Sequence, residues 1–138
     1  MASRSIGCGV EIDRPDVVAE VADVFGRYEK ALVANDLDVL DELFWNDERT
    51  VRFGFGETQV GHQAVSADRR SRERQTRPRF LRLVTITTFG PSMATVTAEF
   101  VPNGTDAVGR QSQTWMRLDE GWRVVSAHVS WEGGRAPD

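Results

Sequence analysis

The stretch that decides the fold is RYEKALVANDLDVLDELFWNDERTVRFGF, residues 27–55. Its first part continues a series of apolar side chains spaced three and four residues apart, which is typical of an amphipathic helix, and Asn35 suits the left-handed position that ends one. Asp36 begins a second, short helix. Residues 50–55 then alternate apolar side chains with Arg52 and a glycine, which predicts a β-strand.

Two polar side chains in this stretch stand among residues that should be buried. Tyr28, the only tyrosine of the chain, lies on the apolar side of the first helix, and Arg52 lies in the middle of the strand. Tyr28 is either an ordinary core tyrosine with one hydrogen bond or a functional phenol. Arg52 either points to solvent, or pairs with an acid such as Glu48 or Glu99, or faces inward. An inward, unpaired guanidinium is costly enough to require an anionic ligand.

Further elements are predicted on both sides of this stretch. Residues 1–10 are expected to form a flexible tail, and Asp13 is expected to cap the first helix, which has Pro15 in its first turn. A third helix is expected at residues 62–75, followed by an antiparallel meander in which Gly121 turns a hairpin. The meander strands are expected at residues 79–89, 94–101, 109–118 and 122–131, before a C-terminal tail at 133–138.

The predicted order is helix, helix, strand, helix and then four strands. Helices that precede an antiparallel sheet indicate an α+β fold, with one domain over residues 11–132. A strongly twisted sheet with helices along its concave side forms a cone, and we expect a ligand pocket at the mouth of that cone.

Composition limits the possible functions. The 138 residues carry a formal net charge of -4, which argues against a nucleic-acid partner. Cys8 is the only cysteine and there are two histidines, so neither a disulfide framework nor a transition-metal site is expected, and no cofactor is implied. The sequence has no signal-peptide pattern and no apolar run of the ~20 residues that a membrane span needs. We therefore expect a cytoplasmic protein with no membrane partner.

A run of arginines begins in the predicted third helix and continues beyond it. One interpretation is a solvated helix face, in which Asp68 and Glu73 interrupt the positive charge. A second is a basic rim that attracts an anionic substrate. A nucleic-acid patch is disfavoured, because no aromatic residues alternate with the arginines. The run consists of Arg69, Arg70, Arg72, Arg74, Arg77 and Arg79.

The order of motifs resembles a known family. RYEKALVANDLDVLDELF near the start and GWRVVSAHVSW at the end resemble the SnoaL-like branch of the nuclear transport factor 2 fold. Together with RTVRFG and GRQSQTW, they resemble more narrowly the oxalurate-catabolism and AtzH-like family, over about residues 11–131. The resemblance implies an activity like that of the decarboxylating amidohydrolase of cyanuric acid catabolism, which converts 1,3-dicarboxyurea to allophanate.

The resemblance also implies site residues. The pocket tyrosine and pocket arginine of the family match Tyr28 and Arg52, which are the implied catalytic residues. A second likeness, to ketosteroid isomerase, places Gln113 near a second oxyanion donor as a substrate-binding residue, although a register shift of one residue would place Thr114 there. The general-base aspartate of the isomerase has no counterpart in the strand around Arg52, which favours a site that binds negative charge.

Three functions stand as hypotheses. The first is a cofactor-independent enzyme that acts on a small anionic, N-carboxylated urea-like acid. The second is a non-catalytic ligand-binding or oligomerisation module, and the third is an isomerase or dehydratase of the ketosteroid isomerase type. We also expect a homodimer or higher homo-oligomer through the sheet face away from the helices, and His128 on that face. The apolar residues predicted for this face are Met116, Leu118, Trp122 and Val124.

Overall fold

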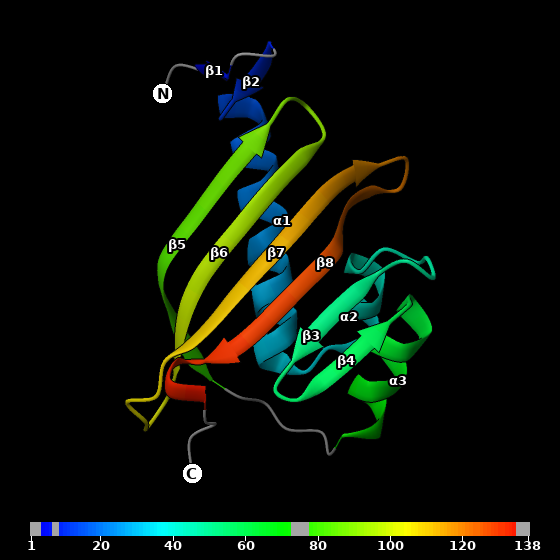
Figure 1. Cartoon of the computed structure of the whole chain (residues 1–138), viewed down its shortest axis with the longest axis vertical. Coiled ribbons are helices and arrows are strands. Elements are labelled where there is room, and N and C mark those ends of the chain that lie inside the picture. The colour runs from blue at the N-terminus through cyan, green and yellow to red at the C-terminus, as the bar shows by residue number, and fades with distance from the viewer. Residues whose placement is uncertain (1–3, 7–8, 73–77, 135–138) are drawn as a thin grey trace.

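The computed structural model describes residues 4–6, 9–72 and 78–134. In this part of the chain, eight strands form one open sheet in the order β1-β2-β5-β6-β7-β8-β3-β4, and the three α-helices lie on one of its faces (Figure 1). We call this helix-covered face the inner face and the opposite one the outer face. Neighbouring strands are antiparallel except β3 and β8, which are parallel. The predicted α+β class is confirmed. The three helices and the four meander strands follow the predicted order, but β1, β2 and β4 are strands that the predicted order lacks.

The elements run as follows: β1 (Arg4–Ile6), β2 (Val10–Ile12), α1 (Pro15–Ala34), α2 (Leu37–Leu43), β3 (Val51–Gly54), β4 (Glu57–Val60), α3 (His62–Ser71), β5 (Arg79–Phe89), β6 (Met93–Pro102), β7 (Gly109–Leu118), β8 (Gly121–Trp131) and a short 3-10 helix, η1 (Glu132–Gly134).

The long helix α1 forms because its apolar residues keep a spacing of three and four residues. Asn35 ends the helix in the left-handed conformation, at a φ of 56°, as predicted. The predicted cap at the other end is wrong, because the N-cap is Arg14. Asp13 instead adopts a φ of 58°, and its carboxylate accepts the backbone N–H of Thr88 at 3.0 Å, which joins the start of α1 to β5. The buried residues of α1 are Val17, Val21, Phe25, Tyr28 and Ala31.

The short helix α2 carries the chain from α1 to the sheet. Asp36 caps it, with a carboxylate oxygen 3.3 Å from the backbone N of Val39. Phe44, just after the helix, forms an isolated parallel bridge with Val124, which brings the chain alongside β8 before β3 begins. The core lies between the helices and the inner face, and its largest fully buried side chains are Trp115, Phe44, Leu40 and Leu43.

An irregularity in the β7–β8 hairpin decides which side chains of β8 reach the core. Thr114 pairs with Ser126, but Trp115 pairs with Val124, so β8 contains one extra residue. A bulge of this kind reverses the alternation of faces along a strand. Trp122 and Val124 are therefore core residues, 5% and 0% exposed, and their predicted place on the outer face is wrong.

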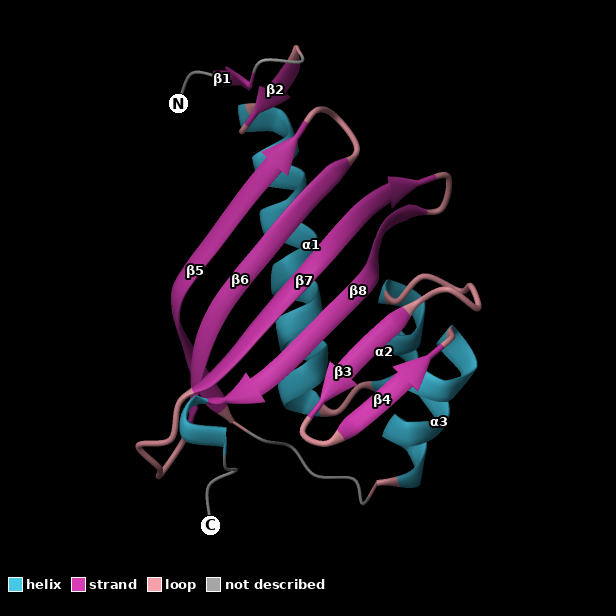
Figure 2. Ribbon diagram, in the orientation of Figure 1, coloured by secondary structure: helices cyan, strands magenta, loops and turns pink. Residues whose placement is uncertain are grey.

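The outer face is the uncovered side of the sheet in Figure 2. His128 is exposed there and lies edge-on to Phe53, with 6.0 Å between ring centroids, so it points away from the helices as expected. Met116 and Leu118 are half-buried. Apolar exposure on this part of the sheet comes instead from Phe53 and Met93, at 42% and 38%.

The two ends of the chain differ from the sequence expectation. The segment expected to be a tail contributes β1 and β2, and β2 reaches β5 through the pairing of Ile12 with Phe89. The third helix ends at Ser71, and the remainder of its predicted range at residues 73–75 lies outside the described residues, as do Cys8, Arg74, Arg77 and residues 135–138. Among the described residues, no helix is long and apolar enough to cross a membrane.

Candidate functional site

A row of side chains across four strands contains two of the three predicted site residues. Gln113 of β7 pairs with Ala127 of β8, Ala127 pairs with Arg52 of β3, and Arg52 pairs with Gln59 of β4. Directly paired residues point to the same face. Because neighbouring strands lie about 4.8 Å apart, the backbones at Gln113 and Arg52 are roughly 10 Å apart, with only the methyl group of Ala127 between them.

Arg52 faces inward rather than toward solvent. Its side chain is 15% exposed, its Nη1 donates to Oε1 of Gln59 at 3.1 Å, and the carboxylate of Glu57 is 3.7 Å away. Gly54, the next inward-facing residue of β3, provides space for the guanidinium, because a Cβ there would lie 3.1 Å from Nη1. Glu99, one of the acids considered as a partner, instead binds two outer-face arginines, Arg82 and Arg110.

The electrostatics of Arg52 locate Tyr28. Burial lowers the pKa of Arg52 below its ordinary value, and the positive charges of Arg69 and Arg72 lower it further. Glu57 raises this pKa, and so does Tyr28 in its charged form, which places the side chain of Tyr28 on α1 within electrostatic range of the guanidinium of β3. A guanidinium remains charged at neutral pH in spite of such shifts. The two implied catalytic residues therefore lie within electrostatic range of each other, and no direct hydrogen bond joins them among the described residues.

Tyr28 is held by aromatic neighbours. It is 5% exposed, and its ring centroid lies 6.2 Å from that of Phe44 and 6.2 Å from that of Trp115. The Trp115 ring meets it edge-on, at 88°. Tilted and edge-on contacts of this kind are favourable aromatic geometries, so they restrict where the phenol can point.

The structure answers the register question at Gln113. This residue is 3% exposed on the inner face, whereas Thr114 is only half-buried and pairs with Ser126. Oε1 of Gln113 accepts the indole N–H of Trp115 at 2.9 Å. That bond fixes the orientation of the carboxamide, whose N–H groups are hydrogen-bond donors.

Arg69 of α3 belongs to the same cluster, although the sequence analysis did not single it out from the arginine run. Its Cζ lies 5.0 Å from the centroid of the Phe44 ring, on the ring face. Its Nε and Nη2 atoms are buried and have no hydrogen-bond partner among the described residues. The sequence did contain a signal: Arg69 follows Val65, the buried residue of α3, by four positions, and residues four apart share a helix face.

A second set of buried polar side chains, Glu29, Arg79 and Gln111, lies next to the first set along α1 and β7. Glu29, next to Tyr28, binds Arg79 of β5, and Arg79 also donates to Oε1 of Gln111 at 2.9 Å. Gln111 lies two residues before Gln113 on the inner face, and its Nε2 is buried without a partner among the described residues. The solvated-face interpretation of the arginine run is therefore wrong for Arg69 and Arg79.

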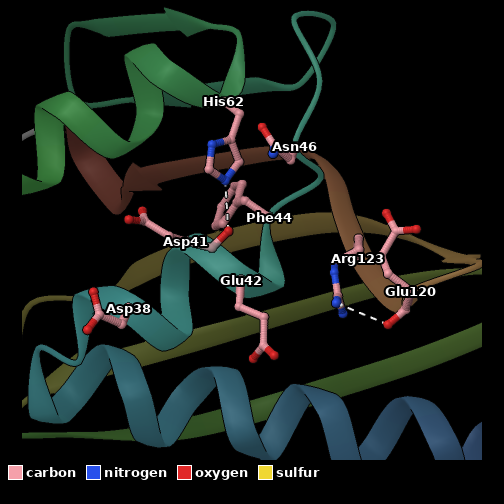
Figure 3. Close-up of a pocket in the computed structure, with 8 residues that line it drawn as sticks. All are labelled: Asp38, Asp41, Glu42, Phe44, Asn46, His62, Glu120 and Arg123. Atoms are coloured by element: carbon pink, nitrogen blue, oxygen red, sulfur yellow. Dashed lines mark hydrogen bonds between the residues drawn. The ribbon is translucent and has the colours of Figure 1, made fainter.

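A separate surface cleft of about 510 Å³ lies beside α2 and the β7–β8 turn (Figure 3). It contains none of the predicted site residues, and four carboxylates line it: Asp38, Asp41, Glu42 and Glu120. His62 points into this region, and its Nε2 lies 2.7 Å from the backbone oxygen of Asp41. No group of metal-ligating side chains suited to a metal ion occurs among the described residues. The acidic lining makes this cleft a poor match for an anionic ligand.

The buried cluster of Tyr28, Arg52, Arg69 and Gln113 has a definite chemical character. Every one of these side chains carries N–H or O–H donors, and both guanidiniums are permanently positive. The nearest acid to Arg52 is shared, because Glu57 also binds Arg72. Such an arrangement suits a small, negatively charged ligand, and the phenol of Tyr28 adds a proton donor within electrostatic range of Arg52.

Comparison with known proteins identifies several of similar structure. At 49% identity and a TM-score of 0.85, the chain is similar to a protein of unknown function from Pectobacterium atrosepticum, over 88% of this chain and 94% of that one. A cystatin-like fold protein from Burkholderia xenovorans is 45% identical, with a TM-score of 0.83 and coverage of 89% and 97%. An NTF2-like protein of unknown function from Pseudomonas putida shares the fold, at 16% identity, a TM-score of 0.72 and coverage of 85% and 87%.

A search of curated proteins found no match. The family model described as AtzH-like matches residues 10–134, which is nearly the whole of the described domain. The protein belongs to the AtzH-like family, on an NTF2-like fold.

Proposed function

We propose that the protein is a cofactor-independent enzyme that removes a carboxyl group from a small N-carboxylated urea-like acid, such as the conversion of 1,3-dicarboxyurea to allophanate. The observation that supports this most is that the buried Tyr28 lies within electrostatic range of the incompletely neutralised guanidinium of Arg52. Membership of the AtzH-like family is compatible with such an enzyme. An oxalurate-like acid is a second substrate of the same chemical kind.

The proposed reaction is simple in its atom balance. The bond between the urea nitrogen and the carboxylate carbon breaks, and the carbon leaves as carbon dioxide. The electron pair of that bond stays with the nitrogen, which takes one proton. The only group the protein has to supply is therefore a proton donor at the nitrogen, together with a means of holding the acid in place.

The residues of the cluster match these roles. Arg52 holds a carboxylate with the N–H groups that Gln59 leaves unoccupied. Tyr28 donates a proton or a hydrogen bond to the urea nitrogen or carbonyl, and water restores the phenol afterwards. Gln113 orients the opposite end of the ligand through its carboxamide N–H groups. The isomerase alternative would need a carboxylate base on β3, where Arg52 stands.

A carbon dioxide release assay with 1,3-dicarboxyurea and with oxalurate tests the proposal. Tyr28→Phe should lower turnover by about 10²–10⁴-fold if the phenol acts as a general acid. Arg52→Ala should also lose most of the activity, because it removes the carboxylate clamp. Arg110→Ala, which changes an exposed arginine on the outer face of β7, is the matched control and should keep wild-type turnover.

Two results would contradict the proposal in different ways. Full turnover by both Tyr28→Phe and Arg52→Ala would remove these residues from the site. A wild-type protein that releases no carbon dioxide from either acid would favour the non-catalytic ligand-binding module.

A further inference from the structure

The starting point is the state of the arginines on α3. Arg70 binds Asp38 and Asp41 at the surface, at 3.0 and 2.5 Å, and Arg72 binds Glu57 and Asp68. Arg69, which precedes Arg70, is half-buried as a residue and forms no ion pair with a described residue, although its Nε and Nη2 atoms are buried. Buried charges are ordinarily paired, so this exception calls for a missing partner.

The atoms left without a partner are chemically specific. Nε and Nη2 form one edge of a guanidinium, with two parallel N–H bonds that match the two oxygens of a carboxylate. Arg79 uses this same edge within the protein: its Nε and Nη2 donate to Glu29 at 2.8 and 2.6 Å. Phe44 covers the face of Arg69, so a ligand approaches along the edge rather than from that side.

Arg69 and Arg52 repel each other through low-dielectric surroundings. The charge of Arg69 is, after burial, the largest cause that lowers the pKa of Arg52. The two come from different elements, α3 and β3, so their proximity depends on the tertiary fold. Within the part of the chain that the structure describes, Arg52 and Arg72 share two carboxylates, those of Glu57 and Asp68, and neither pairs with Arg69, so this group carries excess positive charge before a ligand binds.

The proposed chemistry also favours two anion sites over one. Carbon dioxide leaves as a neutral molecule, so a cation bound to the departing carboxylate would stabilise the starting acid more than the transition state. A cation bound to a carboxylate that stays on the product holds the ligand without this penalty. Two separate guanidiniums allow one to anchor the retained group.

We propose that Arg69 is a second anion-binding residue of this site, and that the ligand is a small dicarboxylate held between Arg52 and Arg69. This inference rests on the proposed function for the location of the site and for an acid with two carboxylates, and it adds the residue that binds the second carboxylate.

Amide-detected NMR titration of the full chain tests the inference with three probes: malonate, acetate and inorganic phosphate. Wild-type protein should bind malonate at least tenfold more tightly than acetate. Arg69→Gln should weaken malonate binding at least tenfold and leave acetate binding within about twofold, which is the selectivity that one lost carboxylate contact produces. Arg70→Gln, adjacent on α3 but ion-paired at the surface, should behave as wild type.

A second measurement separates a ligand-binding role from a structural one. In the absence of ligand, Arg69→Met should unfold at the same temperature as wild type or at a higher one, because it removes an unpaired buried charge and keeps an apolar contact with Phe44. If Arg69 served only to pack the core, this variant would unfold at a lower temperature.

The outcomes distinguish the inference from the proposed function, because binding needs no turnover. Malonate binding that depends on Arg69, without carbon dioxide release, would leave the inference standing and reject the enzyme. No malonate binding by wild type, or unchanged binding by Arg69→Gln, would overturn the inference. Phosphate binding as tight as malonate binding, with the same dependence on Arg69, would overturn the dicarboxylate class.

Discussion

Replacing Glu29 by glutamine should destabilise the protein far more than breaking a surface ion pair. The carboxylate of Glu29 takes both N–H bonds of the Arg79 edge, and the two side chains are only 14% and 10% exposed. Arg79 also lies over the Phe100 ring, 4.1 Å from its centroid. Glutamine keeps the shape of glutamate but leaves this guanidinium buried without a neutralising charge.

The size of the effect follows from this burial. Removing one partner of a buried ion pair costs about 3–5 kcal/mol, and the residual exposure of roughly a tenth favours the lower end, about 3 kcal/mol. For a domain of this length, each 1 kcal/mol lowers Tm by about 3 °C, so we expect a decrease of about 10 °C. Turnover should also decrease, because Glu29 directly follows Tyr28 on α1 and its ion pair joins that helix to β5.

Urea denaturation followed by tryptophan fluorescence measures the free energy of unfolding directly. Asp38→Asn is the matched control: it breaks a 3.0 Å pair with Arg70 in which the aspartate is 93% exposed, and such pairs contribute about 0–1 kcal/mol. The double variant Glu29→Gln/Arg79→Met should recover part of the loss, because it removes the unpaired charge. A loss for Glu29→Gln below about 1 kcal/mol, no larger than that of the control, would refute the reasoning.

Three further predictions concern the site, the ion pair between Asp47 and Arg49, and the outer face. Gly54→Ala should weaken acetate and malonate binding several-fold, because the added Cβ would lie 3.1 Å from Nη1 of Arg52 and displace the guanidinium. Tm should stay equal or rise. Unchanged binding would show that the added methyl group does not displace Arg52. The Asp47 carboxyl should titrate at a pKa of about 2 rather than 3.8, because the side chain and backbone N–H of Arg49 bind it. Since this folded-state pKa lies below the unfolded value of about 3.9, the stabilisation is complete above that pH and is lost as pH falls through about 2. Carbonyl-detected NMR measures the midpoint, which Arg49→Ala should move back toward 3.8; an unmoved midpoint would exclude Arg49 as the cause. Sedimentation equilibrium at micromolar concentration should show a homodimer through the outer face, and Phe53→Glu should shift it to monomer; a wild-type monomer would reject that interface.

Much of the fold was predictable because its signals are local. The bounds of β5 and β7 coincide with the predicted strands at residues 79–89 and 109–118, since alternation and turn residues mark them in the sequence itself. Asn35 and Asp36 likewise separate α1 from α2 by their own conformational preferences. Gly121, at a φ of 120°, occupies the turn where its freedom was expected to matter.

The errors arose where pairing, rather than local pattern, decides the structure. Trp122 and Val124 alternate regularly with their neighbours in sequence, and only the bulge against β7 turns them inward. Asp13 has the residue type of a helix cap, but a partner 75 residues away, Thr88, takes its carboxylate. Neither partner can be identified from the neighbouring sequence.

The site shows the same division. Tyr28 and Arg52 were recognisable as unusual polar residues, but their proximity depends on β3 running parallel to β8, a pairing between segments about 75 residues apart. The row that contains Gln113, Ala127 and Arg52 exists only in the folded sheet. Arg69 could not be recognised for a different reason. The sequence does not distinguish neighbouring arginines of one helix until the structure shows which residues pack against each of them.

The difference between Arg69 and its ion-paired neighbours Arg70 and Arg72 indicates a role for Arg69 in ligand binding rather than in stability. Asp38, Asp41, Glu57 and Asp68 neutralise Arg70 and Arg72, so α3 meets α2 and β4 with matched charges. Arg69 breaks this pattern at the one position that faces the aromatic ring of Phe44 and the charge of Arg52. An apolar side chain at that position would satisfy the core without any desolvated donor. Local conflicts of this kind are expected where a protein binds or transforms a ligand, because the missing interactions are then made by the ligand itself.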